Sequence, residues 1–294
     1  MNRFTSLLCA AAMVFIAPLS LAADDTSVSV TPIKGGLYLL QGKGGNVVAS
    51  VGEDGVLLVD SDYGEYAPAH DKALDELSSE PARFLLNTHW HFDHTGGNQY
   101  WGERNSVIVA HENILKRMST RQEMKALGRV VEPSPAPALP VVTYGDSLAL
   151  HFNGDDIEVQ HVPTGHTDGD SIVFFSRQNV VHVGDHMFVG GFPFVDISSG
   201  GNVFGYIRNL ERVLAKVDDD AVIVPGHGKN TVSKADLAAY HQLLVDSSNM
   251  VKDALAKGDS VEQITERGLG EQYDAYGKGF ISEELWISFI AASL

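Results

Sequence analysis

Short apolar runs recur along this chain and alternate with segments of helical periodicity. The runs are rich in Val, Ile, Leu and Phe, which predicts buried strands. They lie at Val47–Val51, Val56–Val59, Arg83–Leu86, Val107–Ala110, Ser147–Phe152, Ile157–Val162, Ser171–Phe175, Val180–Val183 and Ala221–Val224. Gly52-Glu53-Asp54-Gly55 separates the first two runs and predicts a hairpin.

Helices are predicted where apolar residues repeat every three or four positions. The predicted helices cover Tyr66–Leu77 and His111–Thr120, follow a cap at Asn202, follow Ser233 with Asp236 as a capping box, and follow Ser282. Residues 132–140 carry four prolines and predict a loop between two halves. Strands alternate with helices on both sides of this loop. This order predicts an α/β fold in which two sheets pack face to face with helices outside, an αββα sandwich.

Residues 1–22 are typical of a secretory signal peptide. Arg3 precedes the apolar run Leu7–Ala17, which is too short to span a bilayer, and Ser20-Leu21-Ala22 ends in small residues. An uncleaved anchor is the alternative. We therefore expect an exported protein, periplasmic or extracellular, with a metal-hydrolase domain over residues 23–230. A helical C-terminal extension over residues 231–294 is expected to pack on it.

Charge and cysteine content narrow the classes of function. The formal net charge is −17, which disfavours a nucleic-acid substrate because phosphates would be repelled. Cys9 is the only cysteine and lies in the predicted signal peptide. The mature chain would have a charge of −18, because Arg3 is the only charged residue of that segment, and no thiolate to serve as nucleophile or metal ligand.

A cluster of histidines follows the strand that ends at Leu86. The segment His89-Trp90-His91-Phe92-Asp93-His94 holds three imidazoles and a carboxylate within six residues. Imidazole nitrogens and carboxylate oxygens are the usual ligands of zinc and similar metals. His89 and His91 can converge on one ion, while Asp93 and His94 can turn to a second.

Three further residues of ligand type follow predicted strands. His166, Asp185 and His227 each lie beside a glycine, in Gly165-His166, Gly184-Asp185 and Gly226-His227. Together with the segment at residues 89–94, four predicted strand ends therefore carry residues of ligand type. This number favours a dinuclear metal site over a solvated histidine-rich loop or a mononuclear site.

These motifs, in this order and spacing over about residues 35–230, resemble the metallo-β-lactamase superfamily. The resemblance implies that His89, His91 and His166 bind one metal and that Asp93, His94 and His227 bind the other. Asp185 would bridge the two ions, and Asp93 would also take part in catalysis. Asp60 matches a position that supports the site from outside the ligand set.

The resemblance also implies the chemistry. Two divalent ions, expected to be zinc, would activate a bridging hydroxide that attacks a small acyl substrate, either an ester, a lactone, a thioester or a β-lactam. Asp185 departs from the zinc β-lactamases, which usually have Cys or Ser there, and makes the ligand set resemble glyoxalase II. The chain lacks an evident basic cluster for glutathione.

Other functions remain possible on the same scaffold. A mononuclear iron dioxygenase and a non-catalytic metal-binding protein are the alternatives, and a nuclease conflicts with the charge and the signal peptide. Outside the motifs, His186 is the histidine expected to matter most. Phe192 and Phe194 are candidates to line the mouth of the site, and Lys229 is the nearest candidate to receive a substrate carboxylate.

Overall fold

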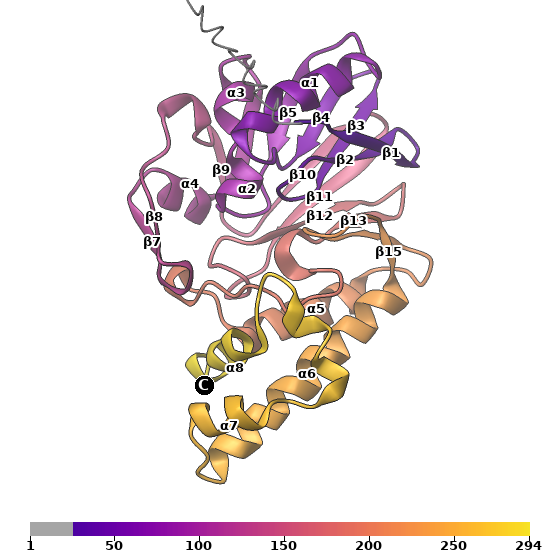
Figure 1. The fold of residues 1–294 in the computed structure, drawn as a ribbon. Coiled ribbons are helices and arrows are strands. Elements are labelled where there is room, and N and C mark those ends of the chain that lie inside the picture. Colours follow the sequence, from indigo (N-terminus) through magenta and orange to yellow (C-terminus); the bar gives the residue numbers. More distant parts are fainter. Residues whose placement is uncertain (1–25) are drawn as a thin grey trace, which may run out of the picture.

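The computed structural model describes residues 26–294. The predicted signal peptide therefore lies outside the described residues. The described chain folds into two large sheets packed face to face, with helices on both outer faces (Figure 1). This arrangement confirms the predicted αββα sandwich. Within residues 26–294, no helix combines the length and the apolar character that crossing a membrane requires.

The first sheet has seven strands and is built by the N-terminal half. In spatial order they are β1 (Ser29–Lys34), β2 (Leu37–Gln41), β3 (Val47–Gly52), β4 (Gly55–Val59), β5 (Ala82–Leu86), β6 (Val107–His111) and β9 (Val142–Tyr144). The first four strands are antiparallel neighbours, and β4, β5, β6 and β9 run parallel. The predicted hairpin is present, with Gly52 paired to Gly55.

The second sheet has six strands from the C-terminal half. They are β10 (Ser147–Phe152), β11 (Asp155–His161), β12 (Ser171–Phe175), β13 (Val180–His182), β14 (Val222–Val224) and β15 (Val232–Ser233). A separate small hairpin joins β7 (Gln122–Met124) to β8 (Arg129–Val131). The proline-rich loop contains only one short 3-10 turn, Ala136–Ala138, and it ends just before β9, the last strand of the first sheet.

Eight α-helices cover the sheets within the described residues. They are α1 (Ala67–Asp75), α2 (Phe92–Thr95), α3 (Asn98–Gly102), α4 (Glu112–Met118), α5 (Val203–Lys216), α6 (Lys234–Ala256), α7 (Val261–Arg267) and α8 (Glu283–Ala292). The predicted caps are present, because the Asn202 side chain accepts from Gly205 N and Ser233 forms a capping box with Asp236.

Some predicted boundaries are wrong. The helix predicted from Tyr66 begins at Ala67, after a 3-10 turn over Gly64–Tyr66. His111 ends β6 instead of opening a helix, and its ring accepts from Asn113 N as the cap of α4. In α5 the buried stripe runs through Val203, Tyr206, Leu210 and Val213, whereas Ile207 and Leu214, which the helical periodicity after Asn202 would place in the core, are only partly buried.

Strand alternation creates three apolar layers. Leu57 and Val59 of β4 point between the sheets, whereas Val56 and Leu58 point to the outer face, where they join Leu74 of α1. On the other side, the outer face of the second sheet packs on α5, α6 and α8. The apolar layer between the sheets is made by residues within the strands, so polar side chains can lie at the strand ends.

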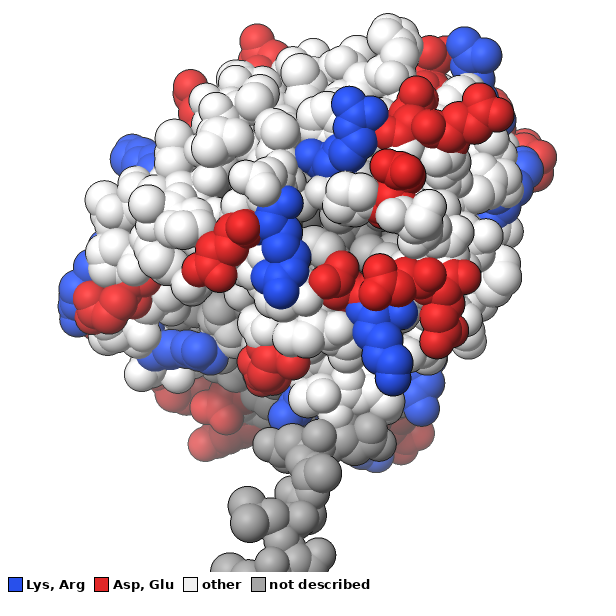
Figure 2. All heavy atoms as spheres, turned by 90° about the horizontal axis from the view of Figure 1, so that it is seen from above, with Lys and Arg blue, Asp and Glu red and all other residues white. Residues whose placement is uncertain are grey.

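Among residues 26–294, no Lys, Arg or Glu side chain is buried, whereas several Asp side chains are. Figure 2 looks down on the end of the molecule where α1 and α3 lie, and acidic and basic side chains are interspersed over that face.

Candidate metal centre

The histidine segment lies in the loop that follows β5 and turns into α2. His91 is the residue before this helix, with an extended backbone, and the helical turn after it directs Asp93 and His94 away from His91. The segment therefore presents its side chains to two places, as the sequence predicted. The donor atoms of His89, His91, His166 and Asp185 all lie within 4.8 Å of one another, and so do those of Asp93, His94 and His227.

In the first group, histidines from two strand ends meet. His166 Nε2 lies 2.7 Å from His91 Nδ1, and the His89 ring lies 4.6 Å from the His166 ring, centre to centre. All three side chains are buried. His166 is held by a hydrogen bond from its Nδ1 to the carbonyl of Phe194, at 2.6 Å, which leaves Nε2 directed into the group.

In the second group, His94 and His227 face each other across Asp93. Their Nε2 atoms are 3.3 Å apart, and His227 Nε2 lies 3.3 Å from Asp93 Oδ2. His227 and Asp93 are partly exposed and line a cavity, whereas His94 is fully buried.

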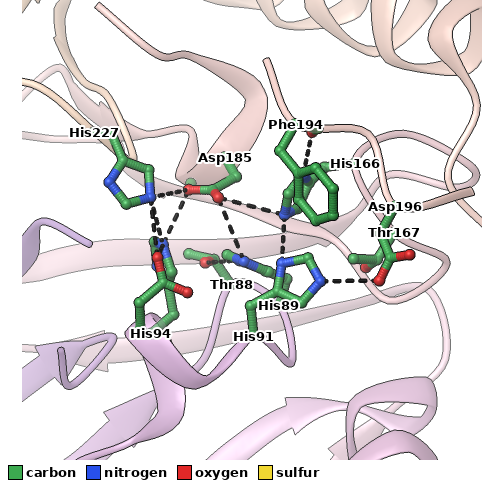
Figure 3. Close-up of polar contacts among 12 residues, drawn as sticks. Thr88, His89, His91, His94, His166, Thr167, Asp185, Phe194, Asp196 and His227 are labelled. Carbon is green, nitrogen blue, oxygen red and sulfur yellow. Dashed lines mark hydrogen bonds and ion pairs between the residues drawn. The ribbon is translucent and has the colours of Figure 1, made fainter. Parts of the chain in front are cut away.

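Asp185 lies between the groups, and its two oxygens divide between them (Figure 3). Oδ2 is 3.3 Å from His166 Nε2 and 3.6 Å from His89 Nε2. Oδ1 is 3.0 Å from His94 Nε2 and 3.4 Å from His227 Nε2. One carboxylate thus faces both sets of imidazoles.

The donor set fits divalent metals. His89 Nε2 and Asp185 Oδ1 are buried without a well-oriented hydrogen bond, although nitrogen and oxygen atoms lie nearby. Buried polar atoms are rarely left unpaired unless an ion or another group satisfies them. Clustered imidazole nitrogens and carboxylate oxygens are the ligands that zinc and similar metals take.

The electrostatics of the two groups differ. Burial lowers the pKa of His166 to about 4, so its imidazole is neutral and free to act as a ligand. Burial would also lower the pKa of His227, but Asp185 and Asp93 raise it to about 9. The second group therefore favours positive charge beside its carboxylates, which is what a divalent cation supplies.

Four of the five ligand-type imidazoles have an outer partner that fixes their orientation, namely His89, His91, His94 and His166. Asp60 is fully buried, with a left-handed backbone (φ 63°), and its Oδ2 lies 2.7 Å from His94 Nδ1 and accepts from the Thr88 hydroxyl. This contact is the support from Asp60 that the sequence predicted. Thr88 Oγ1 in turn lies 3.1 Å from His89 Nδ1.

Asp196 was missed by the sequence analysis. Its Oδ2 lies 3.2 Å from His91 Nε2, which leaves His91 Nδ1 to face His166. Asp196 also accepts from the hydroxyls of Ser198 and Ser199 and is 1% exposed. In the sequence it looks like an ordinary turn residue before Ser-Ser-Gly, so no local signal distinguished it.

Glycines let the backbone approach the ligands closely. A Cβ on Gly226 would collide with Asp185 Oδ1, and one on Gly45 would collide with the His94 ring. Gly45 N also donates to the Asp93 carbonyl at 2.9 Å. The contact with Asp185 explains why a glycine, Gly226, precedes His227 in the motif.

Other candidates take different places. His186 stacks on Tyr206 and faces Asn209, so it joins neither group. Phe192 and Phe194 line the cavity, as predicted. Lys229 is not among the lining residues, whereas Lys43 and Arg129 are.

Comparisons with known proteins agree with this geometry. Residues 40–227 match the family model described as the metallo-β-lactamase superfamily. The chain is similar to the alpha subunit of 2,4-dinitroanisole O-demethylase from Nocardioides sp., with 23% identity over 82% of this chain and 70% of the relative. It is also similar to a hydroxyacylglutathione hydrolase from Haemophilus influenzae, with 27% identity over 51% of this chain and 70% of the relative.

A solved structure, a metallo-β-lactamase from Pontibacter korlensis, shares the fold. The TM-score is 0.61 at 17% identity, over 74% of this chain and 99% of that structure. Since the family model matches more than half of the sequence, this chain belongs to the metallo-β-lactamase superfamily.

Proposed function

We propose that this protein is a dinuclear zinc hydrolase that cleaves an acyl substrate, either an ester, a lactone, a thioester or a β-lactam. The observation that carries the proposal is the division of the Asp185 oxygens, one toward His89 and His166 and the other toward His94 and His227. A carboxylate placed in this way can serve two cations at once.

The two groups of donor atoms provide a ligand set for each ion. His89, His91, His166 and Asp185 would hold one ion, and Asp93, His94, His227 and the same Asp185 would hold the other. When bound, such ions supply Lewis acidity toward a carbonyl oxygen and make a water molecule nucleophilic at neutral pH. Asp60 and Asp196 would keep the imidazoles of His94 and His91 in the required orientation.

Asp93 is the residue we propose to orient the attacking water. Burial would raise the pKa of Asp93, but His94 and a hydrogen bond from His227 outweigh burial and lower the pKa to about 2. The group is therefore ionised at neutral pH. Because its side chain is ionised and lines the cavity, it can accept a hydrogen bond from an attacking water and orient it.

Two further facts support hydrolysis without a protein nucleophile. The sequence after Cys9 has no cysteine, so no thiolate is available there. A relative whose name describes hydrolysis of a hydroxyacyl compound shares the family. The family also contains other activities, so the substrate has to be tested directly.

The test combines metal analysis with a substrate panel. We expect about two zinc ions per chain and faster turnover of at least one ester, thioester, lactone or β-lactam probe than of a phosphodiester probe. One iron per chain with substrate-dependent oxygen consumption would instead identify the dioxygenase alternative. Two bound ions without turnover of any probe would favour the non-catalytic alternative.

A further inference from the structure

The cavity above the metal centre has two features that the hydrolytic chemistry does not use. It measures about 900 Å³, which is large enough for a drug-sized molecule. Its apolar lining comes mainly from Phe92, Phe188, Phe194, Phe280, Met124 and Leu127. Two cationic side chains, Lys43 and Arg129, also line it, together with the carboxylates of Glu65, Asp93 and Asp185. Asp93 and Asp185 belong to the two ligand groups, so Glu65 is the one acidic lining residue outside them.

The phenylalanines form a wall against the histidines. The Phe194 ring lies 5.6 Å from the His91 ring, and the Phe188 ring stacks on His227 at 4.9 Å. Phe280 extends this wall, with its ring 6.3 Å from Phe194. A molecule whose reacting group reaches the histidines therefore places its remaining atoms against aromatic rings.

Phe280 is an apolar side chain that folding leaves uncovered. It is 68% exposed, whereas Phe289, the other phenylalanine after residue 230, is packed in the core. It comes from the segment between α7 and α8, which lies beyond the residues that match the family model. Backbone contacts hold this segment at the cavity, because Phe192 N donates to the Tyr276 carbonyl and Gly279 packs against Gly191.

Arg129 is held at the opening by the β7–β8 hairpin. Its guanidinium carbon lies 3.4 Å from the centre of the Phe92 ring, and Phe92 is the residue between His91 and Asp93. Within residues 26–294, the ion pairs of Lys and Arg involve other side chains, so Arg129 and Lys43 have no carboxylate partner. Stacking on Phe92 fixes the cation while leaving its N–H groups free to donate.

We propose that the substrate is an amphipathic acyl compound, with a bulky planar apolar group that packs on Phe280 and Phe194 and an anionic group that binds Arg129. This proposal rests on the hydrolase function above and names the substrate class of the same site. Burial of Phe280 by the substrate supplies affinity, since apolar contact area is removed from water. The Arg129 guanidinium selects for the charge, and Lys43 adds to the positive potential.

The test uses four nitrophenyl esters with the zinc-loaded full chain. The acyl part is acetyl or phenylbutyryl, and the leaving group is plain or carries a carboxylate. We expect the carboxylated phenylbutyrate to have the highest kcat/KM. Phe280→Ala should lower the kcat/KM for the phenylbutyrate ester, relative to that for the acetate ester, by about 10-fold, which is the scale of one lost phenyl contact. Arg129→Gln should lower the kcat/KM for the carboxylated ester, relative to that for the plain ester, by about 3-fold, as expected for one exposed charge pair.

Matched controls separate these effects from general changes. Lys125→Gln removes the same charge from the turn of the same hairpin, and the Lys125 side chain is not part of the cavity lining. Val141→Ala removes an apolar side chain that is 73% exposed and also lies outside the cavity lining. Neither control should alter either ratio. If Phe280→Ala and Arg129→Gln leave the ratios unchanged while esters are hydrolysed, the amphipathic substrate is wrong and the hydrolase function stands.

A binding measurement does not depend on turnover. The dye anilinonaphthalene sulfonate carries an anionic group that the otherwise similar N-phenylnaphthylamine lacks. We expect the folded, zinc-loaded protein to bind the sulfonate more tightly by fluorescence titration, with Arg129→Gln removing the difference and Phe280→Ala weakening both dyes. If this pattern holds but no ester is cleaved, the hydrolase function is wrong and the amphipathic ligand remains. Equal binding of the two dyes, unaffected by either variant, would overturn the proposal.

Discussion

At the scale of single residues, the proposal depends most on the carboxylate of Asp185. Asparagine keeps the size of this side chain but removes its charge, and an amide bridges two cations poorly. We expect Asp185→Asn to lower turnover of an acyl substrate by roughly 10- to 100-fold or more at saturating zinc, the cost of losing a directed interaction in a metal site. Turnover should fall far more than the stability of the metal-free variant, which loses only the charge that Asp185 places beside His94 and His227. Asp274→Asn, the same change at an exposed position, is the control. Near-full activity of Asp185→Asn would remove the bridging role.

Asp196 allows a separate test of ligand orientation. In Asp196→Asn the amide nitrogen can take the place of Oδ2, where it would face the N–H of His91 Nε2. The remaining oxygen can still accept hydrogen bonds from the Ser198 hydroxyl and from Ser199 N. His91 would lose the contact that directs its Nδ1 to the first group. We expect one of the two zinc ions to be removed by a chelator at about 10- to 100-fold lower concentration. Unchanged retention of both ions would show that the Asp196 contact does not orient a ligand.

At the scale of elements, the site depends on the turn after β14. Gly226 packs against Asp185, and the side chain of alanine has no room there. We expect Gly226→Ala to displace Asp185 and to lower both metal content and activity, while circular dichroism shows the same secondary structure. Gly145→Ala is a matched control, because a Cβ at Gly145 meets no atom within 4 Å. Equal metal content in the two variants would contradict the packing argument.

The elements also show how far the sequence could be interpreted. The central strands β4, β5 and β12 were predicted because they are continuous apolar runs, and α6 because its cap and its apolar face agree. Strands β1 and β2 were not predicted. Strand β1 is largely exposed and contains Pro32, and it owes its conformation to pairing with β2.

The site followed the same division between local and distant signals. Residues with a local motif, such as His89 and His227, were found in the sequence. Asp196 and Phe280 were not assigned roles at the site, since their positions depend on tertiary contacts with His91 and Phe194 that no spacing along the chain encodes. Arg129 belongs to a hairpin whose strands have three residues each, too short to show a periodic pattern, and for this reason the hairpin itself was not predicted.

At the scale of the whole molecule, we propose that the protein is exported after removal of residues 1–22. The apolar run Leu7–Ala17 and the small residues at Ser20 and Ala22 are the features that a signal peptidase reads. We expect the mature chain to begin near Ala23 when the gene product is recovered from outside the cytoplasm. Intact-mass measurement checks this expectation, and a chain that still contains Cys9 would contradict it.

The metal centre should also control the stability of the whole fold, since its ligands come from both halves of the chain. Without metal, burial would lower the pKa of His227, but Asp185 and Asp93 raise it to about 9, above the ordinary value of 6.5. A raised pKa means that this group stabilises the fold fully below about pH 6.5 and that the contribution is lost as the pH rises through about 9. The pKa of His94 is raised for a related reason, since Asp185 and Asp60 outweigh its burial.

We therefore expect the melting temperature of the metal-free protein to fall between pH 6.5 and pH 9, as protonated histidine beside the carboxylates is lost. Zinc replaces that positive charge and binds only the folded chain, so it should raise the melting temperature, and more so at pH 9 than at pH 6.5, where protons compete for the imidazoles. Calorimetry at the two pH values with and without zinc measures the effect. His151→Gln is the control, because His151 is exposed and distant in sequence from every ligand group. A zinc effect that is larger at the lower pH would contradict the assignment of His94 and His227 as ligands.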